Sequence, residues 1–177
     1  MLLRLIPMLD SLITSKTRLK MLIKFFVNTT NKGYLNGLAN EFNESTNSIR
    51  KELNNLSSAG YLLKVKSDNK IIYNANKTHP LFKVLQKVIR QHLGLDQIID
   101  SILDNLGDVN SVALVGDYAK GIDSGLIEVL LLGNKINTDY LKGLIVKIEK
   151  KITRKVSFKI VEVIPKGSLV IYENEKI

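Results

Sequence analysis

The stretch YLNGLANEFNESTNSIRKELNNLSSAGYL, residues 34–62, decides the fold of the first half of the chain. Its apolar residues recur at spacings of three and four, which predicts one helix that begins near Tyr34 and a second that begins at Thr46. The break at 43–45 ends in Ser45, a natural N-cap for the second helix. Two short helices joined by such a turn are typical of a helix-turn-helix. The positions expected to be buried are Leu35, Leu38, Ala39 and Phe42 in the first helix and Ile49, Leu53 and Leu56 in the second.

The residues that precede this stretch extend the helical pattern. Ser15 can cap a helix over 16–27, and a polar turn is expected over 28–33. The apolar segment 1–13 lacks the small-residue cleavage site of a signal peptide and is too short to span a bilayer. We expect it to be a helix that packs on the core or on a partner subunit, in a cytoplasmic protein with no membrane partner.

The residues that follow the second helix predict a β-hairpin. Segments 61–66 and 70–74 are rich in Leu, Val, Ile and Tyr, and the turn-forming residues 67–69 lie between them. Gly60 fits the left-handed conformation that ends a helix. A helix-turn-helix followed by a hairpin is a winged helix-turn-helix, and we expect this fold for residues 1–78.

Residues 15–82 resemble the winged-helix domains of ArsR-type bacterial regulators. The resemblance lies in SKTRLKMLIKFF (15–26), in the stretch 34–62, in KIIYNAN (70–76) and in HPLF (79–82). It implies sequence-specific binding of double-stranded operator DNA, usually as a homodimer. The Cys and His pattern of the metal-responsive members is missing, since the chain has no Cys and only two His, so we expect no metal site.

The positive charge of the chain is concentrated in its first half. Residues 1–94 hold fifteen Lys or Arg and five Asp or Glu, a net charge of +10, whereas residues 95–177 hold eleven and twelve, a net charge of −1. An asymmetry of this kind suggests that the first half meets a polyanion and that the second half has another role.

The polar residues of the predicted second helix and hairpin have the chemistry that DNA recognition needs. In the major groove, Arg and Lys can bond guanine, and Asn can bond adenine. Hydroxyl groups at a helix N-terminus can bond a phosphate, and wing residues can approach the backbone or the minor groove. The predicted DNA-binding residues are Ser45 and Thr46 at the helix N-terminus, Asn47, Ser48, Arg50, Lys51 and Asn54 on its open side, and Lys64, Lys66, Asn69 and Lys70 in the hairpin.

The second half of the chain changes to an α/β pattern. A connecting helix is expected over 79–94, with Pro80 near its start and a domain boundary near Gly94. Its apolar residues cover about half of its circumference, which predicts burial on two sides. Residues 95–177 predict a small α/β domain, so the whole chain is assigned to the α+β class. The expected elements are helices over 95–106 and 139–152 and strands over 111–115, 127–132, 156–163 and 169–172.

The segment LVGDYAKGIDSGLIEVLLLG, residues 114–133, resembles the signature of minimal nucleotidyltransferases. In that family a strand leads into Gly-Ser-x-Ala-Arg-Gly, and a later strand carries Asp-x-Asp. Two carboxylates on that strand and a third on the next core strand hold divalent metal ions against a triphosphate. Here Gly116 is kept, Asp117 replaces the serine, and Lys120 replaces the arginine.

The carboxylate positions of that signature are mostly lost. They fall on Leu126, Glu128 and Ser157, and one carboxylate of three cannot hold two magnesium ions. We therefore expect no enzyme activity, no metal and no cofactor, and a nucleotidyltransferase-like domain that dimerises the chain or senses an effector of open identity. Two alternatives stay open: an active nucleotidyltransferase and an antitoxin-like protein-binding module. A vestigial ligand pocket would be lined by Gly116, Asp117, Lys120 and Glu128.

Overall fold

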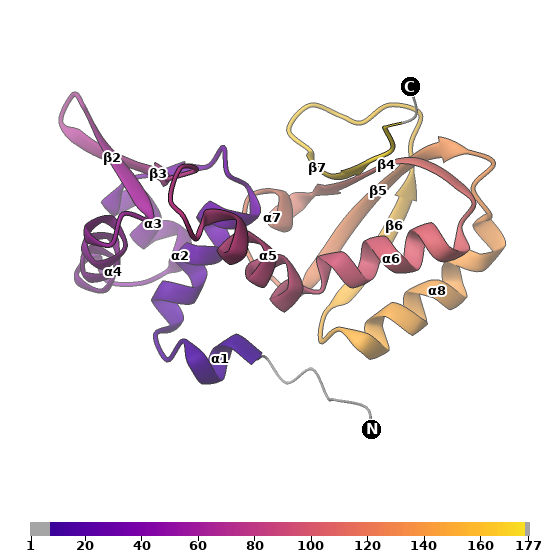
Figure 1. Cartoon of the computed structure of the whole chain (residues 1–177), viewed down its shortest axis with the longest axis horizontal. Coiled ribbons are helices and arrows are strands. Elements are labelled where there is room, and N and C mark those ends of the chain that lie inside the picture. Colours follow the sequence, from indigo (N-terminus) through magenta and orange to yellow (C-terminus); the bar gives the residue numbers. More distant parts are fainter. Residues whose placement is uncertain (1–7, 176–177) are drawn as a thin grey trace. The chain divides into compact units, whose positions relative to one another are not determined.

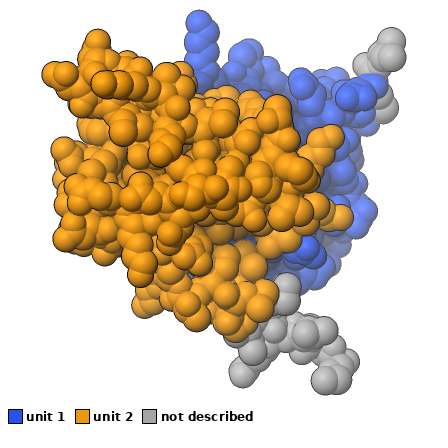
Figure 2. All heavy atoms as spheres, turned by 60° about the vertical axis from the view of Figure 1, so that its left-hand side comes forward, with its two compact units in different colours: residues 1–7, 90–177 blue, residues 8–89 orange. Residues whose placement is uncertain are grey.

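The computed structural model describes residues 8–175, in which helices and strands are mixed as the sequence predicts (Figure 1). These residues divide into two compact units, which Figure 2 colours separately: unit 2 covers 8–89, and the described part of unit 1 covers 90–175. The division lies within the helix predicted over 79–94. Most of the helix predicted over 1–13 lies outside the described residues. No helix within the described part of the chain is long and apolar enough to cross a membrane.

Two helices of unit 2 begin at a serine side-chain cap. The hydroxyl of Ser15 accepts the backbone N–H of Arg18 at 3.1 Å, and that of Ser45 accepts the backbone N–H of Ser48 at 3.2 Å. Each bond satisfies an N–H that has no partner within its helix. The helices are α1 (Met8–Leu12), α2 (Lys16–Val27), α3 (Leu35–Phe42) and α4 (Thr46–Ser58), and the last three confirm the predicted segments.

A three-stranded antiparallel sheet completes unit 2, in the order β1-β3-β2. Strands β2 (Leu62–Ser67) and β3 (Lys70–Ala75) form the predicted hairpin, whose turn places Asp68 at φ 49°. Strand β1 (Lys32–Gly33) pairs with the end of β3. The prediction of a polar turn over 28–33 is therefore wrong for its last two residues, because their partner strand lies far along the chain and leaves no local signal.

The apolar stripes of the helices meet in the core of unit 2. Met21 of α2 and Ile49 of α4 are completely buried, and the ring centroids of Phe26 and Phe82 lie 5.5 Å apart. Burial of one such side chain contributes about 1.5–3 kcal/mol. Of the positions predicted to be buried in α3 and α4, only Leu35 is partly exposed.

Helix α5 (Phe82–Leu93) begins after Pro80, the residue predicted to lie near its start. The reason is local, because the imidazole Nδ1 of His79 accepts the backbone N–H of Leu81 at 3.1 Å and so closes a turn before the helix begins. Gly94, at φ 80°, separates α5 from α6 (Leu95–Asn105).

Unit 1 contains a four-stranded sheet in the order β6-β5-β4-β7, with α6 and α8 along one face (Figure 1). Strand β4 pairs antiparallel with β5 and β7, whereas β5 and β6 are parallel. Ile127, Val129 and Leu131 alternate along β5 and are buried, as expected for the face that the helices cover. The elements are β4 (Asp108–Val115), α7 (Gly116–Ala119), β5 (Leu126–Asn134), α8 (Thr138–Lys151), β6 (Lys155–Ile160) and β7 (Leu169–Glu173).

Two predicted strand boundaries in unit 1 are each wrong by three residues. Strand β4 begins at Asp108, earlier than predicted, because a bulge after Val109 shifts its pairing with β5 and interrupts the alternating pattern. Strand β6 ends at Ile160, whereas the predicted strand continues to Val163, which is 74% exposed. The alternation of apolar and polar residues therefore extends beyond the strand and could not mark its end.

Candidate nucleic-acid interface

The first turn of α4 presents three of the predicted DNA-binding residues, Ser45, Thr46 and Ser48, all of them exposed. The hydroxyl oxygens of Ser45 and Ser48 lie 3.0 Å apart, and Ser45 also caps the helix. Backbone N–H groups point outward at this end of α4, and the helix dipole favours an anion there. The arrangement suits a phosphate group beside the helix end.

The open side of α4 carries Asn47, Arg50, Lys51 and Asn54, and all four side chains are exposed. Nη1 of Arg50 donates to Oδ1 of Asn47 at 3.0 Å, so the guanidinium lies along the helix surface toward its N-terminus. The buried stripe of α4 lies on the opposite side. The helix thus offers both donors and acceptors along one exposed face.

Two lysines of the hairpin, Lys64 and Lys66, lie on the face that Ile71 and Tyr73 share. Lys64 lies directly opposite Tyr73 in the register of β2 and β3, and Lys66 lies opposite Ile71. Residues directly opposite each other in an antiparallel pair share one face. Ile71 and Tyr73 also line a cleft beside α4, so Lys64 and Lys66 are on the cleft side of the hairpin.

That cleft, with a volume of about 380 Å³, lies between α4, the start of α3 and the hairpin. It brings together four of the residues predicted to bind DNA: Arg50 and Asn54 from α4, and Asn69 and Lys70 from the hairpin. Its other lining residues are Tyr34, Leu35, Asn36, Leu53, Ile71 and Tyr73. The predicted residues that lie outside its lining are Ser45, Thr46, Asn47, Ser48, Lys51, Lys64 and Lys66.

Sequence reasoning missed Tyr34 and Asn36 as members of this surface. Both line the cleft, and the Nζ atom of Lys70 lies 4.2 Å from the centroid of the Tyr34 ring. One signal was present, since Tyr34 occupies the N-cap position of α3, where Ser, Thr, Asp or Asn is preferred. An aromatic residue at that position indicates a role other than capping.

The acidic residues of α3, α4 and the turn between them are paired with cations of α2. Glu52 bonds Arg18 at 2.8 Å, Glu44 bonds Lys20 at 2.6 Å, and Glu41 bonds Lys24 at 2.7 Å. The residues involved are Arg18, Lys20 and Lys24 on one side and Glu41, Glu44 and Glu52 on the other. Within residues 8–175, no ion pair uses a cation of the predicted DNA-binding set.

Two of these carboxylates have perturbed pKa values. Burial raises the pKa of Glu52, but hydrogen bonds from Arg18 and Ser15 outweigh it, and the net pKa lies below its usual value of 4.5. Burial likewise raises the pKa of Glu44, and hydrogen bonds from Lys20 and Thr17 bring the net pKa below 4.5. Both side chains are therefore ionised at neutral pH and neutralise Arg18 and Lys20 of α2.

The residues predicted to line a vestigial pocket lie where β4, α7 and β5 meet. Gly116 has φ 64°, and a Cβ atom there would lie 2.0 Å from Oε2 of Glu128, so the carboxylate fills the space beside this glycine. Asp117 and Lys120 are exposed. Ser157 is the register partner of Glu128 on β6. In the described chain, no three His, Cys, Asp or Glu residues are arranged to hold a metal ion.

A second polar cluster of unit 1, centred on Asp123, was not foreseen. Its carboxylate accepts the Tyr118 hydroxyl and two bonds from Arg154, at 2.8 and 2.6 Å, and Arg154 also donates to the carbonyl of His92 at 3.0 Å. Burial raises the pKa of Tyr118, and the bond to Asp123 raises it further. Burial raises the pKa of Asp123 too, but Arg154 outweighs it and holds the net pKa below its usual value. The cluster ties the loop after α7 to the end of α5.

Comparison of the chain with models of protein families, with curated proteins and with solved structures gives no match. The functional evidence is therefore the sequence and the geometry of the chain itself. Both draw attention to the surface of α4 and the β2–β3 hairpin, where basic and amide side chains surround a cleft.

Proposed function

We propose that the chain is a sequence-specific DNA-binding transcriptional regulator. Unit 2 acts as a winged helix-turn-helix, in which α4 enters the major groove and the β2–β3 hairpin is the wing. The observation that carries this proposal is the cleft at which Arg50 and Asn54 of α4 meet Asn69 and Lys70 of the hairpin. Two elements separated in sequence thereby present hydrogen-bonding groups on one basic surface.

The predicted residues divide into two groups with different roles in this proposal. Arg50 and Lys51 read guanine, and Asn47 and Asn54 read adenine, because their side chains match the edges of those bases in the major groove. The remaining residues bond phosphates or flanking base edges and set the register of the protein on the duplex. They are Ser45, Thr46 and Ser48 at the start of α4 and Lys64, Lys66, Asn69 and Lys70 in the hairpin.

The regulator acts as a homodimer on paired half-sites, as is usual for helix-turn-helix proteins. Leu12 at the end of α1 is 79% exposed, and Val84 of α5 is 56% exposed, so these helices carry apolar side chains that residues 8–175 do not bury. Glutamate at either position would place a charge in the subunit contact. Light scattering should then show a dimer for the wild-type chain and monomers for Leu12→Glu and Val84→Glu, whereas a monomeric wild type would end this part of the proposal.

Unit 1 is a nucleotidyltransferase-like domain without catalysis in this account. The support is the row formed by Val115, Glu128 and Ser157, neighbours in the register of β4, β5 and β6, which contains a single carboxylate. Two metal ions need several carboxylates to hold them at a triphosphate. Dimerisation or the sensing of a small effector remains as the role of this unit.

The experiment that tests the proposal is selection of DNA from the native genome by the full chain, followed by competition with random duplex. A specific regulator binds its site about a thousandfold or more tighter than random DNA at near-physiological salt. Equal affinity for selected and random fragments would contradict the proposal.

A further inference from the structure

Helix α3 contains a glycine whose position is explained by an aromatic ring. Glycine inside a helix is unfavourable, yet Gly37 is the third residue of α3. A Cβ atom on Gly37 would lie 2.8 Å from Cε1 and 2.9 Å from Cζ of Tyr34, closer than real Cβ contacts. The ring of Tyr34 therefore rests against Gly37, and any larger residue there would displace it.

The Tyr34 ring in turn holds the ammonium group of a hairpin lysine. Nζ of Lys70 lies 4.2 Å from the ring centroid, within the range at which a cation is attracted to an aromatic face. Lys70 is the first residue of β3, directly after the turn of the hairpin. Tyr34 thus connects the start of α3 to the turn of the β2–β3 hairpin and fixes the position of the Lys70 ammonium group.

Both residues line the cleft described above, and its composition matches one chemical class of ligand. Lys70 supplies the cation for this subsite, Arg50 borders it from α4, and Leu53 and Tyr73, 1% and 7% exposed, supply an apolar floor. No acidic residue is among its lining residues. Phosphate oxygens are bound by Lys and Asn side chains, and the carbon atoms of a sugar ring gain from burial against apolar side chains. The amides of the cleft are Asn36, Asn54 and Asn69.

We infer that this cleft seats one phosphate and the adjoining deoxyribose of the DNA strand that passes between α4 and the hairpin, and that Tyr34 is a positioning residue for Lys70. The inference rests on the proposed function, since it names a subsite of the same interface. The subsite contributes affinity that does not depend on sequence and that weakens with salt, because it neutralises a phosphate.

The first arm of the test uses the free protein and no DNA. The ring of Tyr34 should shift the Lys70 side-chain ε-proton resonances upfield in NMR spectra of the full chain. Tyr34→Phe keeps the ring and should keep the shift, whereas Tyr34→Leu and Gly37→Ala should remove it. Unshifted Lys70 protons in the wild type would overturn the positioning role.

The second arm measures DNA affinity of the full chain from about 50 to about 200 mM salt. Lys70→Gln should flatten the logarithmic salt slope by about 0.9, with Lys77→Gln, an exposed lysine outside the cleft, as the matched control. Tyr34→Leu and Gly37→Ala should weaken binding about two- to fivefold and flatten the slope. Tyr34→Phe should keep the affinity and the salt slope of the wild type.

A double-variant cycle separates this inference from the proposed function. Tyr34→Leu should have little further effect once Lys70 is glutamine, because its effect passes through that lysine. Additive effects, or an unchanged salt slope in Tyr34→Leu, would overturn the inference while selective binding by the wild type still stood. A wild type without selectivity would refute the proposed function, and the NMR arm would still decide the pairing of Tyr34 with Lys70.

Discussion

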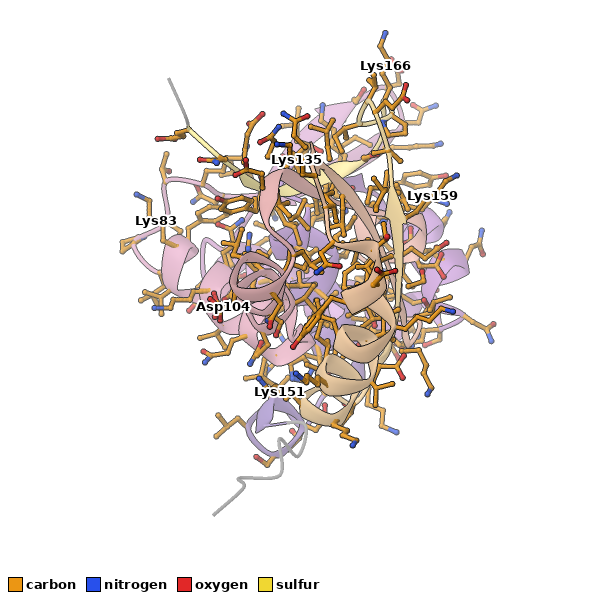
Figure 3. All side chains as sticks on the ribbon, turned by 90° about the vertical axis from the view of Figure 1, so that its right-hand side faces the viewer. Lys83, Asp104, Lys135, Lys151, Lys159 and Lys166 are labelled. Atoms are coloured by element: carbon orange, nitrogen blue, oxygen red, sulfur yellow. The ribbon has the colours of Figure 1, made fainter. Side chains whose placement is uncertain are left out.

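Unit 2 and unit 1 both carry many lysines, but they arrange them differently. In unit 2 the carboxylates of α3, α4 and the turn between them pair with cations of α2, and cations of α4 and the hairpin lie on a separate surface around the cleft. In unit 1 the lysines project in different directions from separate elements, as Figure 3 shows for Lys135, Lys151, Lys159 and Lys166. Segregation of charge, more than its total, therefore distinguishes a surface suited to a polyanion.

The largest expected effect is a loss of DNA affinity on substitution of a cation in unit 2, compared with substitution of a cation in unit 1. Arg50→Ala should cost about 1–3 kcal/mol of binding free energy and relax sequence preference at one position, because a bidentate bond to guanine is lost. Lys142→Ala removes an exposed cation from α8 of unit 1 and serves as the control. Equal losses for the two variants, measured by equilibrium titration, would erase the contrast between the units.

The next effect concerns the ion pair between Glu52 and Arg18 in unit 2. Glu52→Gln should lower the free energy of unfolding by about 1–3 kcal/mol, because the side chain is buried and bonds both Arg18 and Ser15. Glu162→Gln, at an exposed position of unit 1, should change it by less than about 0.5 kcal/mol. Chemical denaturation of the full chain measures both, and an unperturbed Glu52→Gln would show that this pairing does not stabilise the unit.

The same carboxylates predict how stability depends on pH. The pKa values of Glu44 and Glu52 are lowered on folding, so their contribution is complete above the usual pKa of 4.5 and is lost as pH falls through the lowered values. Stability should therefore stay level from neutral pH to about 5 and then fall. Denaturation curves of Glu52→Gln should show a weaker fall below that pH than the wild type, and parallel curves would contradict the assignment.

A smaller effect probes the crowding beside Glu128 in unit 1. Gly116→Ala should cost about 1–2 kcal/mol for the left-handed backbone, plus the cost of displacing the Glu128 carboxylate. Gly167→Ala is a matched control, since its φ is 86° and nothing lies within 4 Å of the added Cβ. In a Glu128→Ala background, Gly116→Ala and Gly167→Ala should lower the free energy of unfolding by equal amounts. A persistent difference would show that something other than the carboxylate crowds Gly116.

The smallest expected effect is an absence of catalysis. With magnesium or manganese and labelled nucleoside triphosphates, the full chain should release no pyrophosphate above background, because one carboxylate cannot hold two metal ions. Protein, RNA and small-molecule acceptors should be offered in turn. Release that disappears in Glu128→Ala would make unit 1 an enzyme and would reverse its proposed role.

Local signals explain which parts of the fold could be predicted. Helices α2 and α4 lie where expected because Ser15 and Ser45 cap them and their apolar residues repeat with helical spacing. The β2–β3 hairpin was equally clear from its turn residues. Strand β1 and the bulge in β4 were missed because both depend on pairing with a distant or irregular partner strand.

The candidate site was predictable to the extent that single elements define it. The open side of α4 follows from the position of its buried stripe, so Arg50 and Asn54 could be named from the sequence. The partnership of Tyr34 with Lys70 could not, because it joins two elements that only the tertiary fold brings together. The bonds of Asp123 with Arg154 were hidden for the same reason.

Mapping of backbone amide shifts during titration with a selected duplex tests whether unit 2 is the part of the chain that binds DNA. NMR spectra of the full chain report every unit in one experiment. We predict that the large shifts fall on residues 45–54 and 64–71, with those of 116–128 unchanged at the same DNA concentration. Shifts concentrated on 116–128 or on α8, with 45–54 unmoved, would contradict the assignment of DNA binding to unit 2.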